Sequence, residues 1–360
     1  MNEVKQGLEG VVAFETEIAE PDREGGALRY RGVDIEELVG FVPYEKVWGL
    51  LVDQTLDPGM PDAEPYVLRD PTGDAPADLQ AATARLGAEW GLGKLVDVDA
   101  AQAREDLGRL SATMMSIVAQ SARAAEGKPP VADEASARGK TAAERFLLRW
   151  RDEADPRQVR AVDTYWICTA EHGINASTFT ARVVASTGAD CAAAMSAAVG
   201  ALSGPLHGGA PARVIPMLEE AAALGDPARY VRELLARGER IMGFGHRVYR
   251  AEDPRARLLR RTAKELGSVR FEVAEELERA ALDELRRRKP DRVLATNVEF
   301  WSAVVLDIAD IPPAVTPAMF ACARVAGWSA HILEQKHLGK LIRPSAAYVG
   351  PGTRPLAAVG

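Results

Sequence analysis

The chain has 360 residues, of which 47% are hydrophobic and 27% charged, and its formal net charge at pH 7 is -8. This composition is typical of a globular protein of about two domains and excludes extended disorder. The acidic balance disfavours non-specific binding to nucleic acid or to an anionic membrane. An anionic ligand would therefore need a local group of arginines.

The N-terminal sequence and the cysteines indicate the cellular location. The first residues lack the basic and apolar regions of a signal peptide, and the apolar run 191–202 is too short to span a bilayer. Cys168, Cys191 and Cys322 are far apart and form no CxxC pair, which favours reduced thiols over disulfides or a metal site. We therefore expect a cytoplasmic protein without a membrane segment.

The first half of the chain predicts one β-ribbon followed by helices. Residues 9–31 alternate apolar and polar positions around the turn-forming run PDREGG, which predicts a short β-ribbon. The segment 57–76 carries five prolines and is expected to be a loop. Helical periodicity is found on both sides of this loop, over 43–53, 78–92, 101–125 and 138–152.

The second half of the chain is predicted to be helical throughout. Residues 159–203 hold two Ala-rich helical patterns, interrupted near 171–175 and at Gly188, and they suggest a buried central pair. Three amphipathic segments follow over 214–288, and two further helices are expected near 298–309 and over 317–337. Since no strands alternate with these helices, a doubly wound parallel sheet is disfavoured and the predicted fold class is mostly α.

Three of the five histidines lie in segments that a packing role does not explain. His207 lies in SGPLHGGAP, His246 in GFGHRVYRAEDPR and His172 in EHGINAST, and glycines beside a histidine let a ligand approach the backbone. The alternative for each is a hydrogen-bonded core histidine at a helix end. His331 and His337 are six residues apart on one predicted helix, which turns them to different faces. No metal-ligand spacing is present, so no metal is expected.

Arginines provide a second group of candidate residues. Arg250, Arg255, Arg324 and Arg343 lie near the histidine motifs or in apolar surroundings, and a forked guanidinium pairs with a carboxylate through two hydrogen bonds. These residues suit a small polycarboxylate substrate. The alternative is internal salt bridging, which Asp253 makes plausible for Arg255.

One carboxylate and one glycine motif complete the candidate residues. Glu299 lies in TNVEFWSAVV among apolar neighbours, so it is either paired structurally or a base with an altered pKa. The GFG of residues 243–245 is not a dinucleotide fingerprint, because Val248 stands where that motif needs its third glycine. It suggests a tight backbone turn against another flat or anionic ligand.

Taken together, these segments resemble citrate synthases. The resemblance covers about residues 7–352 and lies in GLEGVVAFETEIAE with LRYRGVDIEEL, EHGINASTFTARVVAST, SGPLHGGAP, GFGHRVYRAEDPRA, TNVEFWS and LIRPSAAYVGP. It implies a mostly helical homodimer with the short N-terminal β-ribbon. It further implies a large domain over 1–208, a small domain over 209–309 and a return to the large domain over 310–360.

The resemblance also implies a role for each candidate residue. His207 corresponds to the donor to the thioester carbonyl, His246 to the group that polarises the oxaloacetate carbonyl, and Glu299 to the base. The implied oxaloacetate ligands are His172, Arg255, Arg324 and Arg343, the last reaching the partner subunit's site. The implied CoA ligands are Arg250 and the backbone of Ile241, Met242, Gly243, Phe244 and Gly245. No cofactor is implied beyond acetyl-CoA as co-substrate.

The implied reaction condenses acetyl-CoA with oxaloacetate and water to give citrate and CoA, a step of the tricarboxylic acid cycle. A 2-methylcitrate synthase that uses propionyl-CoA is the alternative, because one methylene in a pocket changes binding by only about 1–3 kcal/mol. The family's usual motif has Asp where this chain has Glu299, and about 1 Å of misplacement can cost on the order of 10²-fold in rate. That departure alone supports a third hypothesis, a non-catalytic relative that binds CoA or oxaloacetate.

Overall fold

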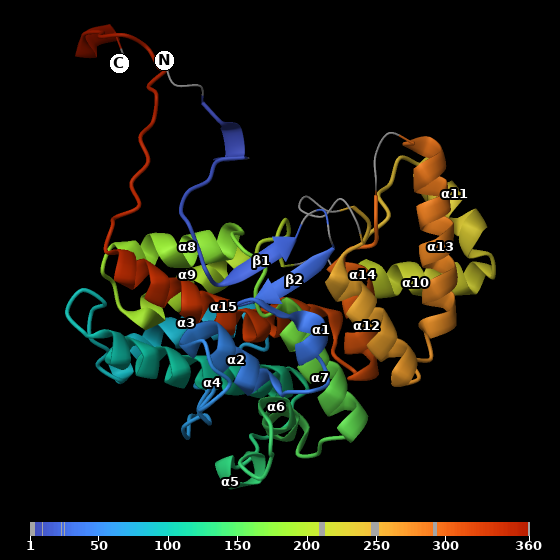
Figure 1. Ribbon diagram of the computed structural model, residues 1–360, viewed down its shortest axis with the longest axis horizontal. Helices are drawn as coiled ribbons and strands as arrows, with labels where there is room; N and C mark the ends of the chain where they lie inside the picture. The colour runs from blue at the N-terminus through green and yellow to red at the C-terminus, as the bar shows by residue number, and fades with distance from the viewer. Residues whose placement is uncertain are drawn as a thin grey trace.

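The computed structural model describes residues 4–8, 10–22, 24, 26–208, 213–245, 252–290 and 294–358. Over these ranges the chain is mainly helical, with one small sheet close to the N-terminus (Figure 1). The helices are α1 Ile35–Leu38, α2 Tyr44–Asp53, α3 Ala75–Glu89, α4 Ala100–Ala125, α5 Asp133–Ser136, α6 Ala142–Arg151, α7 Pro156–Thr169, α8 Ala176–Ser186, α9 Cys191–Leu202, α10 Val214–Leu224, α11 Pro227–Ala236, α12 Pro254–Glu265, α13 Phe271–Arg288, α14 Val298–Ile308 and α15 Thr316–Leu338. Short 3₁₀ turns lie at Gln6–Leu8, Pro313–Val315 and Leu356–Ala358.

The predicted β-ribbon is present and has a short third strand. Strands β1 (Ala19–Asp22) and β2 (Ala27–Tyr30) are antiparallel, with Ala19 opposite Tyr30. Strand β3 (Val33–Asp34) then pairs with β2 and leads directly into α1. The Tyr30 hydroxyl donates to the backbone oxygens of Ile167 and Glu171, so the sheet is tied to the end of α7.

Short polar side chains begin many of the helices. Each accepts a hydrogen bond from a backbone N–H of the first turn, which would otherwise have no partner. Such N-caps are Asp34, Asp74, Asp99, Thr141, Asp155, Asn175, Asp190, Asp226, Asp253 and Asn297. Two of them matter for the site below, because Asn175 begins α8 and Asn297 begins α14.

Helix α15 lies at the centre of the larger group of helices. It is buried along most of its length and packs against α2, α4, α7 and α8. Both interruptions expected in the Ala-rich region end a helix, so α7, α8 and α9 follow one another as separate helices. Small alanine side chains let α8 and α9 pack closely along each other.

Helices α10 to α14 gather on the other side of the molecule (Figure 1). The described part of the region 214–288 holds four helices instead of the three expected, because α12 ends at Glu265 and Gly267, two residues later, takes a left-handed φ of 64°. Helices α12 and α14 also pack against α7, so both meet the larger group there.

The three cysteines are free and buried. Burial raises the pKa of Cys168 and Cys322 far above the usual thiol range and that of Cys191 to about 12. Among the described helices, none is both long and apolar enough to cross a membrane.

Candidate active site

A cavity of about 170 Å³ opens where α7, α12, α14 and α15 meet. It is lined by Tyr165, Thr169, His172, Asn175, His207, Arg255, Val298, Glu299, Ser302, Phe320 and Arg324. Five candidate residues from the sequence, distant along the chain, therefore face one space: His172, His207, Arg255, Glu299 and Arg324. The volume lies below the ~300–1,000 Å³ typical of sites for drug-sized ligands and suits a small acid.

His207 is held in the turn after α9 with one ring nitrogen already occupied. Its Nε2 accepts from the backbone N–H of Ser177 at 3.4 Å and lies 2.9 Å from the Ser177 hydroxyl. Because an amide N–H can only donate, Nε2 must be an acceptor, and the proton of the neutral ring is assigned to Nδ1.

The surroundings of His207 keep the ring neutral. Burial, together with the nearby positive charge of Arg324, lowers the pKa of His207 to about 4. At pH 7 the side chain is therefore an uncharged imidazole with one N–H to donate, which suits an oxygen that gains negative charge during a reaction.

Arg255, in the first turn of α12, is paired with the residue that caps the same helix. Its Nε and Nη2 donate to the two carboxylate oxygens of Asp253 at 2.9 and 2.8 Å. The salt bridge considered from the sequence is thus present, and Arg255 lines the cavity as well. Bidentate pairing fixes the plane of the guanidinium group.

Arg324 enters the cavity from α15 and is 2% exposed. Its Nε donates to the Thr169 backbone oxygen at 3.0 Å, and the guanidinium carbon lies 4.7 Å from the centre of the Phe320 ring. Among the described residues Nη1 has no hydrogen-bond partner. Burial lowers the pKa of this arginine, and the negative charge of Glu171 opposes that shift.

Glu299 lies in the first turn of α14, where its backbone N–H donates to the Asn297 side chain at 3.0 Å. Burial raises the pKa of its carboxyl group, and the charge of Arg255 acts in the opposite direction. A carboxylate that is partly desolvated is a stronger base than one in water.

Several lining residues were not singled out from the sequence. Ser302 is three residues after Glu299 on α14, and Phe320 is four before Arg324 on α15, so helical periodicity places each beside a predicted site residue. Tyr165 and Thr169 share one face of α7 for the same reason. This spacing was the signal that could have found them.

Other predicted residues lie elsewhere. Arg343 is exposed in the segment after α15 and does not line the cavity. In the predicted CoA segment Ile241–Gly245, the Gly243 oxygen accepts from the Asn297 N–H at 2.9 Å. Gly243 and Gly245 have φ of 86° and 89°, as the expected tight turn requires. His246 and Arg250 lie outside the described residues.

These groups lie together in a mostly helical protein and have the chemistry that an enzyme site for a small anionic substrate needs. Two buried guanidinium groups suit carboxylates, while a neutral imidazole and a partly desolvated carboxylate suit proton donation and removal.

Comparisons with known proteins agree with this class. The family profile described as "Citrate synthase, C-terminal domain" matches residues 7–66 and 67–345. A Mycobacterium tuberculosis protein named "Putative citrate synthase 2" is 60% identical over 349 residues, which cover 97% of this chain and 93% of that protein. The citrate synthase of Synechocystis is 36% identical over 375 residues, covering 97% and 92% of the two chains.

A solved structure extends the likeness to the fold. It is the ternary complex of Thermoplasma acidophilum citrate synthase with carboxymethyl coenzyme A and oxaloacetate, with a TM-score of 0.84 and 29% identity. The match covers 99% of this chain and 100% of the other. The chain belongs to the citrate synthase family, and the predicted citrate-synthase-like helical fold is confirmed.

Proposed function

We propose that the protein condenses acetyl-CoA with oxaloacetate and water to give citrate and CoA. The observation that carries this proposal is the convergence of His207, Glu299, Arg255 and Arg324 on one cavity. The Thermoplasma relative, whose solved complex holds oxaloacetate and a CoA derivative, supports the choice of substrates.

In the proposed first step, Glu299 removes a proton from the methyl group of acetyl-CoA. The electron pair of that C–H bond moves towards the thioester, and His207 donates its Nδ1 proton in a hydrogen bond to the thioester oxygen. The neutral state of His207 is suited to this role.

In the second step, the methyl-derived carbon attacks the ketone carbon of oxaloacetate, and His246 is the expected donor to the ketone oxygen. His172, Arg255 and Arg324 are the proposed ligands of the substrate carboxylates, and the positive charge of the two arginines offsets the charge that develops nearby. Water then cleaves the thioester of citryl-CoA, releasing citrate and the CoA thiol.

The proposal includes a dimer and two domains. Arg343, on the segment that leaves the body after α15 (Figure 1), would reach the site of a partner subunit. The segment 209–309 would form the small domain that closes over the ligands, so that acetyl-CoA is shielded from water before condensation. Arg250 and the backbone of 241–245 are the proposed CoA contacts.

The test is thiol release from a panel of acyl-CoAs with and without oxaloacetate. We expect release with acetyl-CoA that depends on oxaloacetate, and slower release with propionyl-CoA and butyryl-CoA. A large preference for propionyl-CoA would replace the proposal with 2-methylcitrate synthesis. Binding of both ligands without any thiol release would replace it with a non-catalytic role.

A further inference from the structure

The hydroxyl group of Ser177 lies at the centre of three buried polar contacts beside His207. Ser177 is the second residue of α8 and is 0% exposed. Its Oγ lies 2.9 Å from His207 Nε2, 2.9 Å from Asn175 Oδ1 and 3.2 Å from Trp328 Nε1. A hydroxyl group has one proton to donate and two lone pairs, so the direction of each contact can be assigned in turn.

Trp328 makes its contact with Ser177 as a donor. An indole N–H has no lone pair to offer, so Ser177 Oγ accepts from it. Trp328 is 0% exposed and lies one turn after Arg324 on α15. A hydroxyl group that accepts a hydrogen bond is polarised and donates its own proton more strongly. Trp328 therefore makes Ser177 a better donor.

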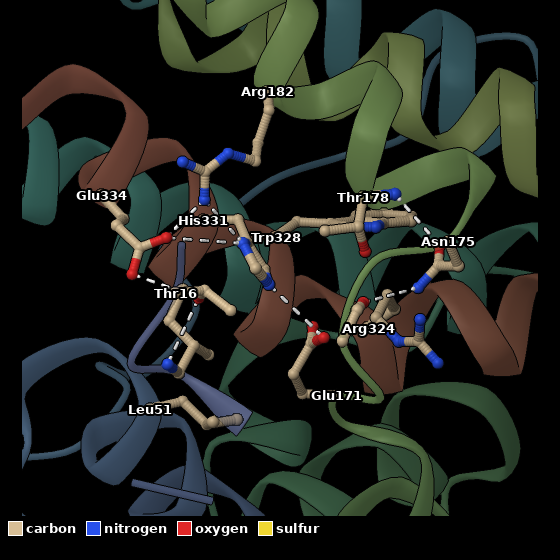
Figure 2. A network of polar contacts seen from close by, with 12 residues as sticks. Thr16, Leu51, Glu171, Asn175, Thr178, Arg182, Arg324, Trp328, His331 and Glu334 are labelled. Carbon is tan, nitrogen blue, oxygen red and sulfur yellow. Dashed lines mark hydrogen bonds and ion pairs between the residues drawn. The ribbon is translucent and has the colours of Figure 1, made fainter. Parts of the chain in front are cut away.

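Two acceptors among the described residues compete for the Ser177 proton. Asn175 Oδ1 already accepts from the Thr178 N–H at 3.1 Å, as the cap of α8 (Figure 2). His207 Nε2 accepts from the Ser177 N–H at 3.4 Å, which is longer than the usual range of about 2.7–3.2 Å. An imidazole nitrogen, with a pKa of about 6.5 in water, is also far more basic than an amide oxygen. The hydroxyl proton is therefore assigned to the contact with His207.

A buried network beside these contacts holds α8 against α15 (Figure 2). Arg182 of α8 donates to Glu334 of α15, and its Nη1 lies 3.0 Å from His331 Nδ1 on the same helix. His331 Nε2 in turn lies 3.4 Å from Oε1 of Glu171, which follows α7. Arg182, His331 and Glu171 are 0% exposed. These contacts fix the two helices relative to each other, and with them the distance between the indole and the hydroxyl group.

Donation by Ser177 has two effects on His207. It occupies the lone pair of Nε2, so the proton of the neutral ring stays on Nδ1. It also polarises the ring, which makes Nδ1–H a stronger donor. The ring of Phe320 lies with its centre 6.0 Å from that of His207, at an interplanar angle of 74°, and packs against the imidazole on another side.

We propose that Ser177 and Trp328 are positioning residues for His207. The Ser177 hydroxyl group, held by the Trp328 indole, donates to His207 Nε2 and keeps the imidazole proton on Nδ1. This inference rests on the proposed function, in which His207 Nδ1 donates to the thioester oxygen.

The first test observes the imidazole directly by NMR on protein whose five histidines carry ring ¹⁵N labels. The His207→Ala protein identifies the His207 signals. In the wild type Nδ1 should carry the proton and Nε2 should not. Ser177→Ala should shift the Nε2 resonance towards that of an acceptor without a partner, and Trp328→Phe should shift it less in the same direction. A protonated Nε2 in the wild type, or an unchanged resonance in Ser177→Ala, would overturn the proposal.

The second test separates kcat from KM. Ser177→Ala should lower kcat on the order of tenfold or more, while both KM values change less than about threefold, because donation by His207 matters most in the transition state. Trp328→Phe should lower kcat less. If Trp328 acts through Ser177, combining the two changes should cost little beyond Ser177→Ala alone. Fully additive losses in kcat would contradict that route.

A second tryptophan and serine pair provides the matched control. Trp48 Nε1 donates to Ser111 Oγ at 3.1 Å, and both residues are 0% exposed and do not line the cavity. Trp48→Phe and Ser111→Ala therefore remove the same kind of buried hydrogen bond. They should lower the melting temperature but leave the His207 resonances unchanged and kcat within about twofold. A loss of kcat as large as in Ser177→Ala would mean that packing alone explains the effect.

The NMR test needs no substrate, so the two proposals can fail separately. The expected Nε2 shifts combined with a wild-type protein that releases no thiol would contradict the proposed function and support the role of Ser177. Thiol release by the wild type with an Nε2 resonance that Ser177→Ala leaves unchanged would contradict the positioning role alone.

Discussion

The carboxylate of Asp253 joins Arg255 to the helix that carries the proposed base. Both of its oxygens accept from the Arg255 guanidinium, and Oδ2 also accepts from the backbone N–H of Val298 at 3.1 Å. Val298 is the first residue of α14 and directly precedes Glu299. One buried side chain therefore sets the distance between a proposed substrate ligand and the proposed base.

Asp253→Asn should loosen this arrangement. An amide offers one acceptor oxygen where the carboxylate offers two, so Arg255 loses its bidentate partner. We expect KM for oxaloacetate to rise about tenfold and kcat to fall, measured by thiol release. The control is Asp226→Asn, since Asp226 also caps a helix, accepting from the Arg229 N–H at 2.8 Å, and does not line the cavity. Equal effects of the two variants would show that capping alone explains the loss.

Glu299→Gln should abolish condensation, with kcat lowered on the order of 10³-fold and oxaloacetate binding nearly unchanged. Because burial raises the pKa of Glu299, the fraction of active base in the wild type falls as pH drops through a value above 4.5. The wild-type kcat/KM should therefore fall on the acid side of its pH profile, with a midpoint above pH 4.5. Near-normal turnover of Glu299→Gln by thiol release would refute the assignment of the base.

His207→Ala should lower kcat far more than it raises either KM, because its hydrogen bond is needed chiefly in the transition state. With a pKa of about 4, the imidazole is neutral across the range from pH 5 to 8. His207 should therefore contribute no inflection to the pH profile of the wild-type rate near pH 6.5, the usual pKa of a histidine. Such an inflection in the pH profile would mean that His207 works in its charged form.

Arg343→Ala tests whether the site is shared between subunits. The single variant should be nearly inactive, as should His207→Ala. Mixed dimers of the two variants contain one site with both residues intact if Arg343 reaches across, so part of the activity should return. Verified mixed dimers without any recovery would contradict the shared site.

Asp163→Asn should change stability in a pH-dependent way. The Asp163 carboxylate accepts from the N–H of Tyr44, the first residue of α2, whose N-cap Pro43 has no side chain to do so. Burial raises the pKa of Asp163 to about 7. An acid with a raised folded pKa favours the folded state below its unfolded value near 3.8, and that contribution is lost as pH rises towards 7.

The Asn variant retains the acceptor without the charge, so its stability relative to wild type should increase between pH 5 and pH 8. The expected gain is about 1 kcal/mol or more, read from urea unfolding at the two pH values. A difference that does not vary with pH would mean that Asp163 stays ionised in the folded protein.

Much of the fold was predictable because local signals act within one helix. Caps such as Asn175 and Asn297, the proline-rich loop 57–76 and the turn PDREGG fix where elements begin and end. The break between α12 and α13 was missed, since a single Gly267 interrupts an otherwise continuous amphipathic pattern.

The candidate site was predictable only in part, for a physical reason. Motif residues could be found one by one, but the partner of a buried charge is set by tertiary packing. His331 was compared only with His337 on its own helix, and the two do face differently, one buried and one exposed. Its actual partner Glu171 lies 160 positions earlier, and no local pattern links the two.

The burial of the three thiols has a practical consequence for every assay proposed above. Cys168, Cys191 and Cys322 are at most 1% exposed, and their raised pKa values keep them in the unreactive thiol form at neutral pH. A disulfide reagent that forms a yellow product with the free CoA thiol will therefore react very little with the cysteines of the folded enzyme. The colour then counts catalytic turnovers, and a slow rise without substrate reports unfolding of the protein.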